Sequence, residues 1–216
     1  MPSYFDGKGN CCSETGNSFD IRIAQNKKSR RKAFVLPRCL FYITRKGKCA
    51  VNKLCAMLKK QVLPNFINLE TAVKTYDRDA LVCGAPAWRY VYHVIHSADK
   101  WFFNPFVFDE PPFHRDGMDN PDNPCDIVLS DGELLEYLEK VRDKTLDYID
   151  TLTDEMLLEC PESCPFSRFE LALMQFRHIS LHIGMLNGLT IERTGRFPLT
   201  VGASGYDRLK SGLFDE

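Results

Sequence analysis

The stretch QFRHISLHIGMLNG, Gln175–Gly188, decides the fold class of this chain because it lies inside a long run of helical periodicity. The sequence Ser167-x-x-Glu170 before it is a capping box, which marks the start of a helix. Gly195 after it is well placed to end one. We therefore expect a helix that extends from this capping box to about Arg193.

Two histidines, His178 and His182, lie four residues apart on that expected helix. At about 100° per residue they differ by about 40° and share one apolar face with Leu171 and Met185. Such a pair can reach one metal ion, as on the zinc-binding helix of H-E-x-x-H enzymes, although the glutamate of that motif is absent here. A lone buried histidine is more often a hydrogen-bonded core residue, but two on one stripe both need polar partners. A third ligand would decide between these interpretations.

Three other segments are expected to be helical, and no segment of the sequence has a convincing strand pattern. Periodicity begins near residue 50, where Pro64 marks either a kink or the first turn of a second segment. A further helix should extend from near Pro86 to around Phe103. Another follows the capping box Ser130-x-x-Glu133 and ends near Asp150. The sequence thus predicts an all-α fold, a four-helix bundle.

A long connection, from Pro105 to Leu129, separates the second and third expected helices. It is polar, rich in proline and without periodicity. Loops of this length are often lids or binding loops. Phe113, His114 and Arg115 within it are therefore our candidates for contact with a substrate.

The chain divides by charge into two different parts. Residues 1–60 carry 14 Lys and Arg against 3 Asp and Glu, and the remainder carries 14 against 26. We expect residues 1–48 to be a basic, disordered arm, residues 49–195 the helical domain, and residues 196–216 a polar tail. The run KKSRRK, Lys27–Lys32, is compatible with nucleic-acid binding, but such runs are more often solvated charge.

Nine cysteines cannot all pair within one chain, and their spacing is scattered. No secretory signal is visible, and no run approaches the roughly 20 apolar residues of a membrane span. These features favour a cytoplasmic protein without a membrane partner. Cys160 and Cys164 fit a zinc knuckle poorly, since no second cysteine pair follows, and we expect two free thiols.

The second expected helix offers His93 and His96 as a third metal ligand. His96 lies at the edge of the apolar arc of this helix, whereas His93 lies on the side that carries Arg89 and Lys100. We therefore select His96 as the inward histidine.

Two motifs in this order resemble the DinB-like (YfiT-like) superfamily of four-helix bundles over roughly residues 50–195. On the second helix, the family's Trp-to-His spacing and the acidic residue that follows are matched by Trp88, His96 and Asp99. On the fourth helix, the family's H-x-x-x-H-x-G-Q is matched by His178, His182 and Gly184, with Met185 in place of the glutamine.

The resemblance implies a divalent metal, commonly nickel or zinc, held by His96, His178 and His182 with coordination positions left open. Three neutral imidazoles leave the ion's charge uncompensated, which favours anionic ligands and lowers the pKa of a bound water or thiol. Asp99 could orient an imidazole as a hydrogen-bond acceptor. Members of the superfamily include S-transferases and isomerases that use a low-molecular-weight thiol.

The sequence thus favours a metal-dependent enzyme with a small-molecule substrate, either a small-thiol S-transferase or a hydrolase. The first alternative is a non-catalytic metal-binding or stress-response module. The second is nucleic-acid binding through the basic arm, which the acidic helical part disfavours. A homodimer is compatible with a bundle of this kind.

Overall fold

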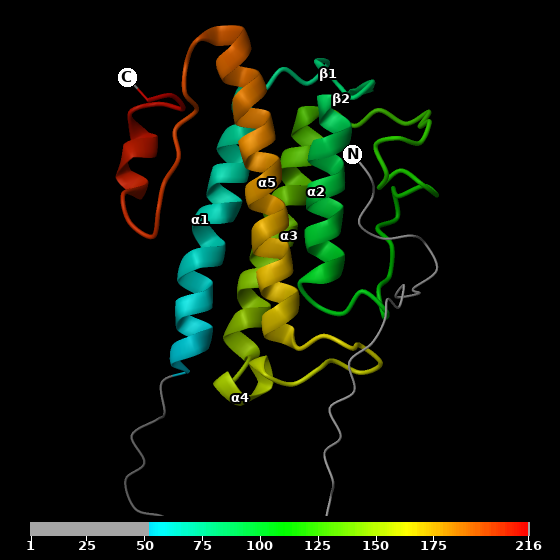
Figure 1. The fold of residues 1–216 in the computed structure, drawn as a ribbon, viewed down its shortest axis with the longest axis vertical. Helices are drawn as coiled ribbons and strands as arrows, with labels where there is room; N and C mark the ends of the chain where they lie inside the picture. Colours follow the sequence, from blue (N-terminus) through cyan, green and yellow to red (C-terminus); the bar gives the residue numbers. More distant parts are fainter. Residues whose placement is uncertain (1–51, 216) are drawn as a thin grey trace, which may run out of the picture. The chain divides into compact units, whose positions relative to one another are not determined.

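A computed structural model describes residues 52–215 of the chain, so the expected arm over residues 1–48 and its KKSRRK run lie outside the described residues. Helices dominate the described part (Figure 1). The elements are α1 Lys53–Thr75, β1 Leu81–Val82, β2 Ala85–Pro86, α2 Ala87–Trp101, α3 Asp131–Thr151, α4 Asp154–Leu157, α5 Arg168–Thr194 and the 3₁₀ helix η1 Tyr206–Lys210. The expectation of a helical fold is confirmed.

The two capping boxes form as the sequence predicts. The Ser130 hydroxyl accepts from the backbone N–H of Glu133 while the Glu133 carboxylate accepts from the backbone N–H of Ser130, and Ser167 and Glu170 repeat this exchange at the start of α5. Gly195 ends α5 with a φ of 69°, in the left-handed region that glycine adopts without strain. These local signals therefore fix the bounds of the helix that carries His178 and His182.

Helix α1 is continuous through Pro64, which lies buried inside it. The proline is thus not the first turn of a separate helix.

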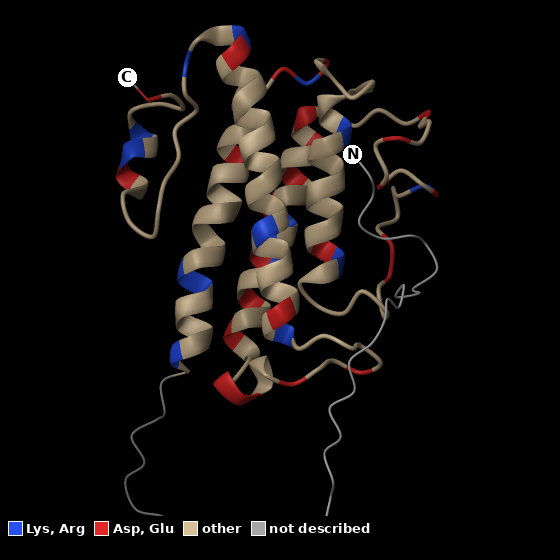
Figure 2. Cartoon of the chain, in the orientation of Figure 1, with Lys and Arg blue, Asp and Glu red and all other residues tan. Residues whose placement is uncertain are grey.

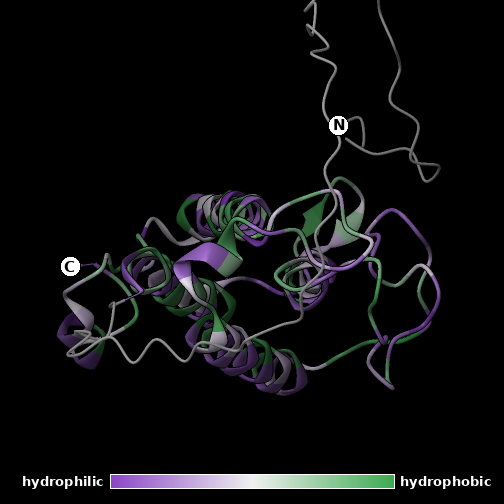
Figure 3. Cartoon of the chain, turned by 90° about the horizontal axis from the view of Figure 1, so that it is seen from below, coloured by the Kyte–Doolittle hydropathy of each residue, from purple (hydrophilic) through white to green (hydrophobic). Residues whose placement is uncertain are grey.

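The four long helices lie side by side around one apolar core (Figure 1). Helix α1 packs against α3 and α5, and α2 packs against the same two helices, so that each face of the core is closed. The view along the helices in Figure 3 shows this arrangement end-on. The largest fully buried side chains include Phe66, Leu69, Tyr92, Ile95, Leu134, Leu171, Ile179 and Leu186. Charged residues are spread along the same helices and their connections (Figure 2).

Two small features have no counterpart in the sequence-based expectation. The strands β1 and β2 form a hairpin of two residues each, and its turn places Cys83 and Gly84 at φ values of 50° and 90°. Positive φ at both central residues is typical of a tight hairpin turn. Two-residue strands are too short to show an alternating pattern in the sequence.

The C-terminal segment packs more closely than a polar tail would. Leu199 and Val201 are buried, and Asn68 of α1 exchanges two hydrogen bonds with the backbone of Val201, at 2.8 and 2.9 Å. An isolated bridge pairs Pro198 with Phe214. This segment therefore belongs to the folded unit as a cover on α1.

The long loop between α2 and α3 is anchored on α2 by a buried arginine. The guanidinium of Arg89 donates to the carbonyls of Asn120, Asn123 and Met118 at 2.8, 3.0 and 3.4 Å. Met118 itself is only 1% exposed. The loop is thus held against the helix, which determines where its histidine and carboxylates lie.

Among the described residues, no helix combines the length and the apolar character needed to cross a membrane. The cysteines of this part of the chain, Cys160 and Cys164 included, form no disulfide.

Candidate metal centre

Three imidazoles from two helices converge beside the core. His93 of α2 and His178 and His182 of α5 bring one ring nitrogen each within 4.8 Å of one another. The Nε2 atom of His178 lies 3.0 Å from Nε2 of His182 and 3.1 Å from Nε2 of His93. His182 is 8% exposed, and the other two are partly buried. We call this group the three-histidine cluster.

Two of the spacings between these nitrogens are close to those of tetrahedral coordination. With Zn–N bonds of about 2.05 Å, two ligands of a tetrahedral ion lie about 3.3 Å apart. The observed 3.0 and 3.1 Å separations need to widen by only about 0.3 Å. Small rotations of three side chains would supply this change.

A hydrogen bond at the second ring nitrogen of His93 determines which of its two nitrogens carries the proton. Its Nδ1 lies 2.6 Å from the backbone carbonyl oxygen of Asp119. A carbonyl only accepts, so Nδ1 carries the hydrogen, and a neutral His93 presents the lone pair of Nε2 to the cluster. Metal-binding histidines are commonly oriented in this way by a carbonyl or carboxylate.

The imidazoles of His178 and His182 are held neutral, and each has a ring nitrogen without a hydrogen-bond partner. Burial, and then neighbouring imidazoles, lower the pKa of His178 to about 4 and that of His182 to about 3. Their Nδ1 atoms are buried without a hydrogen-bond partner. Because His178 Nε2 faces two other nitrogens, a single proton on it cannot satisfy both contacts once His93 presents a lone pair. A cation at the centre would satisfy all three lone pairs.

The structure places His93, and not the expected His96, beside His178 and His182. The structure joins His93 to the pair on α5, and it groups His96 with Glu110 and His114 instead. The charge pattern of the sequence places the side of α2 that carries Arg89 toward solvent. Arg89 is only 4% exposed, because carbonyls of the long loop cover it, and that side of the helix is therefore not a solvent face.

The second group, His96, Glu110 and His114, also places three ligand atoms within 4.8 Å of one another. Nε2 of His96 lies 2.5 Å from Oε2 of Glu110, and Nε2 of His114 lies 3.8 Å from the same oxygen. Burial lowers the pKa of His96 despite the carboxylate beside it. Burial alone would raise the pKa of Glu110, but the hydrogen bond from His96 and the contact with Lys100 hold it below its usual value.

Asp99 takes partners other than an imidazole. Its carboxylate accepts from the hydroxyl of Tyr137 at 2.9 Å and from Nζ of Lys144 at 2.6 Å, and its residue is 8% exposed. Burial, followed by the charge and hydrogen bond of Asp99, raises the pKa of Tyr137. Asp99 therefore ties α2 to α3, and the expected role of orienting a histidine is not what its contacts show.

The three candidate substrate contacts on the loop have separate environments. Phe113 lines a hollow of about 240 Å³ together with Tyr137 and residues of α3. His114 belongs to the group with His96. Arg115 is exposed and donates to the carbonyls of Pro112 and His114 within its own loop.

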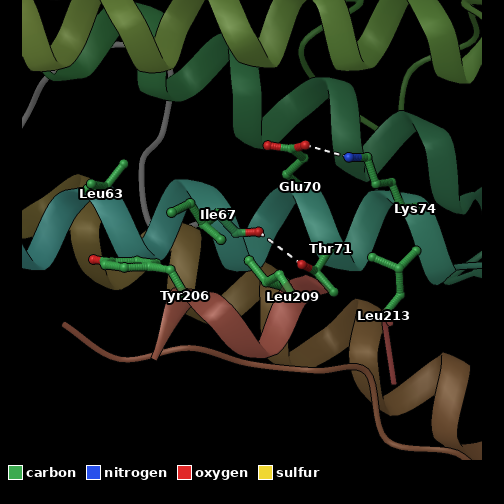
Figure 4. A pocket seen from close by; sticks show the side chains of 8 residues that line it. All are labelled: Leu63, Ile67, Glu70, Thr71, Lys74, Tyr206, Leu209 and Leu213. Atoms are coloured by element: carbon green, nitrogen blue, oxygen red, sulfur yellow. Dashed lines mark hydrogen bonds and ion pairs between the residues drawn. The ribbon is translucent and has the colours of Figure 1, made fainter. Parts of the chain in front are cut away.

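A larger cavity lies away from both histidine groups. It has a volume of about 340 Å³ and lies between α1 and the C-terminal segment, with the Glu70–Lys74 ion pair at its edge (Figure 4). Its lining residues are Leu63, Ile67, Glu70, Thr71, Lys74, Tyr206, Leu209 and Leu213. The lining is mainly apolar and offers no histidine or cysteine.

Comparison with known proteins gives no relative: no family model, no curated protein and no solved structure matches this chain.

Proposed function

We propose that this protein is a divalent-metal-dependent enzyme, a small-thiol S-transferase or a hydrolase, with the ion held by His93, His178 and His182. The observation that carries the proposal is that Nε2 of His178 lies 3.0 and 3.1 Å from the Nε2 atoms of His182 and His93, within a group whose ligand atoms all lie within 4.8 Å of one another. Because one proton on His178 Nε2 cannot satisfy both neighbouring nitrogens, this arrangement fits a cation better than a set of hydrogen bonds among neutral imidazoles.

The ion would supply a Lewis acid that lowers the pKa of a thiol or water molecule. The protein's part is to aim three imidazoles at one point and to keep His178 and His182 neutral. The Asp119 carbonyl keeps the His93 proton on Nδ1, and burial keeps His178 and His182 unprotonated near neutral pH. Within residues 52–215, no carboxylate belongs to the cluster, so an ion there would retain its charge and attract an anionic ligand such as a thiolate.

The DinB-like resemblance supports the proposal on α5. On α2, the histidine of the cluster differs from the one that the resemblance implies. The H-x-x-x-H-x-G sequence of α5 supplies two of the three cluster histidines. On α2 the cluster uses His93, five residues after Trp88, so the Trp88-to-His96 spacing is not the spacing of this site. We further propose that the fold is a four-helix bundle of DinB type and that the ion is nickel or zinc.

The first test is the metal content of the purified full-length protein. We expect wild type to hold more zinc or nickel than the variant with His178→Ala and His182→Ala, with a deficit of one ion per chain. Arg177→Ala, an exposed change on the same helix, is the matched control and should keep the wild-type content. Equal metal in wild type and the double variant would refute the site.

The second test separates an enzyme from a non-catalytic module. Wild type loaded with metal should accelerate the reaction of a low-molecular-weight thiol with an aryl halide, or the hydrolysis of an activated ester, and the double histidine variant should not. If metal removal lowers the melting temperature but no turnover is ever present to be lost, the site is structural and the enzymatic proposal is wrong.

A further inference from the structure

The group of His96, Glu110 and His114 lies outside the three-histidine cluster and has no part in the function proposed above. His96 comes from α2, and the other two residues come from the long loop. We propose that these three residues form a second divalent-metal site, of the type with two histidines and one carboxylate. This inference does not depend on the three-histidine cluster.

One carboxylate oxygen of Glu110 faces both histidines of this second site. Oε2 of Glu110 faces Nε2 of His96 at 2.5 Å and Nε2 of His114 at 3.8 Å. With metal–ligand bonds of about 2.0–2.2 Å, the donor atoms around an ion should lie roughly 3.0–3.4 Å apart. Binding would therefore move the carboxylate by about 0.5 Å away from His96 and toward His114. Its side chain is 40% exposed on a loop, so this movement is unobstructed by core packing.

The two imidazoles are more rigidly placed than the carboxylate. His96 is 2% exposed, and the His114 ring stacks on it with centroids 4.6 Å apart and planes inclined by 14°. The hydroxyl of Tyr92, a fully buried residue, lies 2.6 Å from Nδ1 of His114. That contact occupies one nitrogen of His114 and leaves Nε2 to face Glu110. A partner on the distal nitrogen is the usual support of a metal-binding imidazole.

The charged groups beside the site are the Glu110 carboxylate and the Lys100 ammonium, which offset one another in part. Lys100 Nζ lies 3.3 Å from Oε1 of Glu110, and so contacts the oxygen that the site does not use. Glu110 contributes a negative charge that the three-histidine cluster lacks. Two imidazoles and one carboxylate with further positions open suit zinc and the neighbouring divalent transition metals.

An ion at this position would join the loop to α2. Glu110 and His114 lie in the part of the loop that precedes the Arg89 anchor at Met118, Asn120 and Asn123. Metal binding would therefore fix the first half of the loop, as Arg89 fixes the second. Backbone amides over residues 106–116 should exchange more slowly with solvent when zinc is bound.

The test uses full-length protein dialysed against Zn²⁺, with bound zinc measured by elemental analysis. We expect two ions per chain in wild type and one in Glu110→Gln and in His114→Ala, with affinity at this site reduced by about 100-fold or more. Asp109→Asn and Arg115→Ala are matched controls, because both residues are exposed neighbours in the same loop, and both should retain two ions.

Combined variants separate this proposal from the previous one. With His178 and His182 replaced by alanine, one zinc should remain, and adding Glu110→Gln should remove it. If the Glu110→Gln and His114→Ala variants bind zinc as their controls do, the second site does not exist. If the α5 double variant keeps as much zinc as wild type while Glu110→Gln alone binds none, the second site stands and the three-histidine cluster fails. Unchanged amide exchange over residues 106–116 on zinc binding would contradict the joining of loop and helix.

Discussion

Lowering the pH should destabilise the metal-free protein through His178 and His182. Burial and neighbouring imidazoles lower the pKa of His178 to about 4 and that of His182 to about 3. In the unfolded chain a histidine titrates near about 6.5. Between these values the unfolded state binds protons that the folded state does not. The stability due to this pair is therefore fully present above pH of about 6.5 and is lost as the pH falls below it.

The size of the loss at about pH 5.5 follows from the unfolded state, because both folded-state pKa values lie more than one unit below that pH. Each unfolded histidine is protonated there in a ratio of about 10 to 1, which stabilises the unfolded chain by RT ln 11, or about 1.4 kcal/mol. The two residues together should reduce the free energy of unfolding by about 3 kcal/mol relative to neutral pH.

The assay is urea unfolding at about pH 7.5 and 5.5 with a chelator present, followed by circular dichroism. The reference protein carries His178→Gln and His182→Gln, whose amides do not titrate. Carboxylates shared by both proteins contribute equally, so the difference between the two pH dependences isolates the pair. If the double variant does not fold, His182→Gln alone should remove about half of the effect. Equal losses in wild type and variant, or a wild type that becomes more stable in acid, would refute the reasoning.

Three further predictions concern ion binding, helix capping and the buried carboxylate. In Glu110→Gln protein, which keeps only the three-histidine cluster, zinc at 100 times its dissociation constant should stabilise the fold by about 2.7 kcal/mol and raise the melting temperature by roughly 5–11 °C. The same zinc should have no effect once His178 and His182 are also replaced, and a persisting shift would contradict the ligand assignment. Ser167→Ala should cost about 1 kcal/mol in urea unfolding, because it removes the acceptor for the Glu170 N–H at the start of α5, and a loss below about 0.3 kcal/mol would show that the capping box is not needed. Tyr137→Phe should cost about 1–3 kcal/mol by leaving one oxygen of buried Asp99 without its donor, whereas Tyr90→Phe, whose partner is the carbonyl of Val82, serves as the comparison and should cost less.

The parts of the fold that could be predicted are those with local causes. A capping box uses only residues within one turn, so Ser130 and Ser167 identify the starts of α3 and α5 without knowledge of the tertiary fold. The pair His178 and His182 was predictable for the same reason, since four residues on one helix always share a face. Pro64 could not be interpreted locally, because whether α1 continues through it depends on packing against α3 and α5.

The position of His93 beside the pair on α5 was missed because solvent exposure on α2 is decided by a distant segment. The helix has charged residues on the side of His93, which suggests a solvated face. Loop carbonyls 29 to 34 residues further along the chain cover Arg89 instead. The loop lacks periodicity, so nothing in its sequence indicates where it folds back. A signal was present in Arg89 itself, one turn before His93, but a helix-face argument treats an arginine as exposed.

The loop between α2 and α3 supports both histidine groups, and this explains why two histidines only three residues apart can serve different sites. The carbonyl of Asp119 holds Nδ1 of His93, whereas Glu110 and His114 approach His96. Residues three apart on a helix differ by about 60° in direction, enough for His93 to face α5 while His96 faces the loop. Each imidazole therefore needs a separate partner segment. A connection short enough to join two adjacent helices directly would have supplied neither Asp119 nor Glu110, so the length of this loop is part of what makes both arrangements possible.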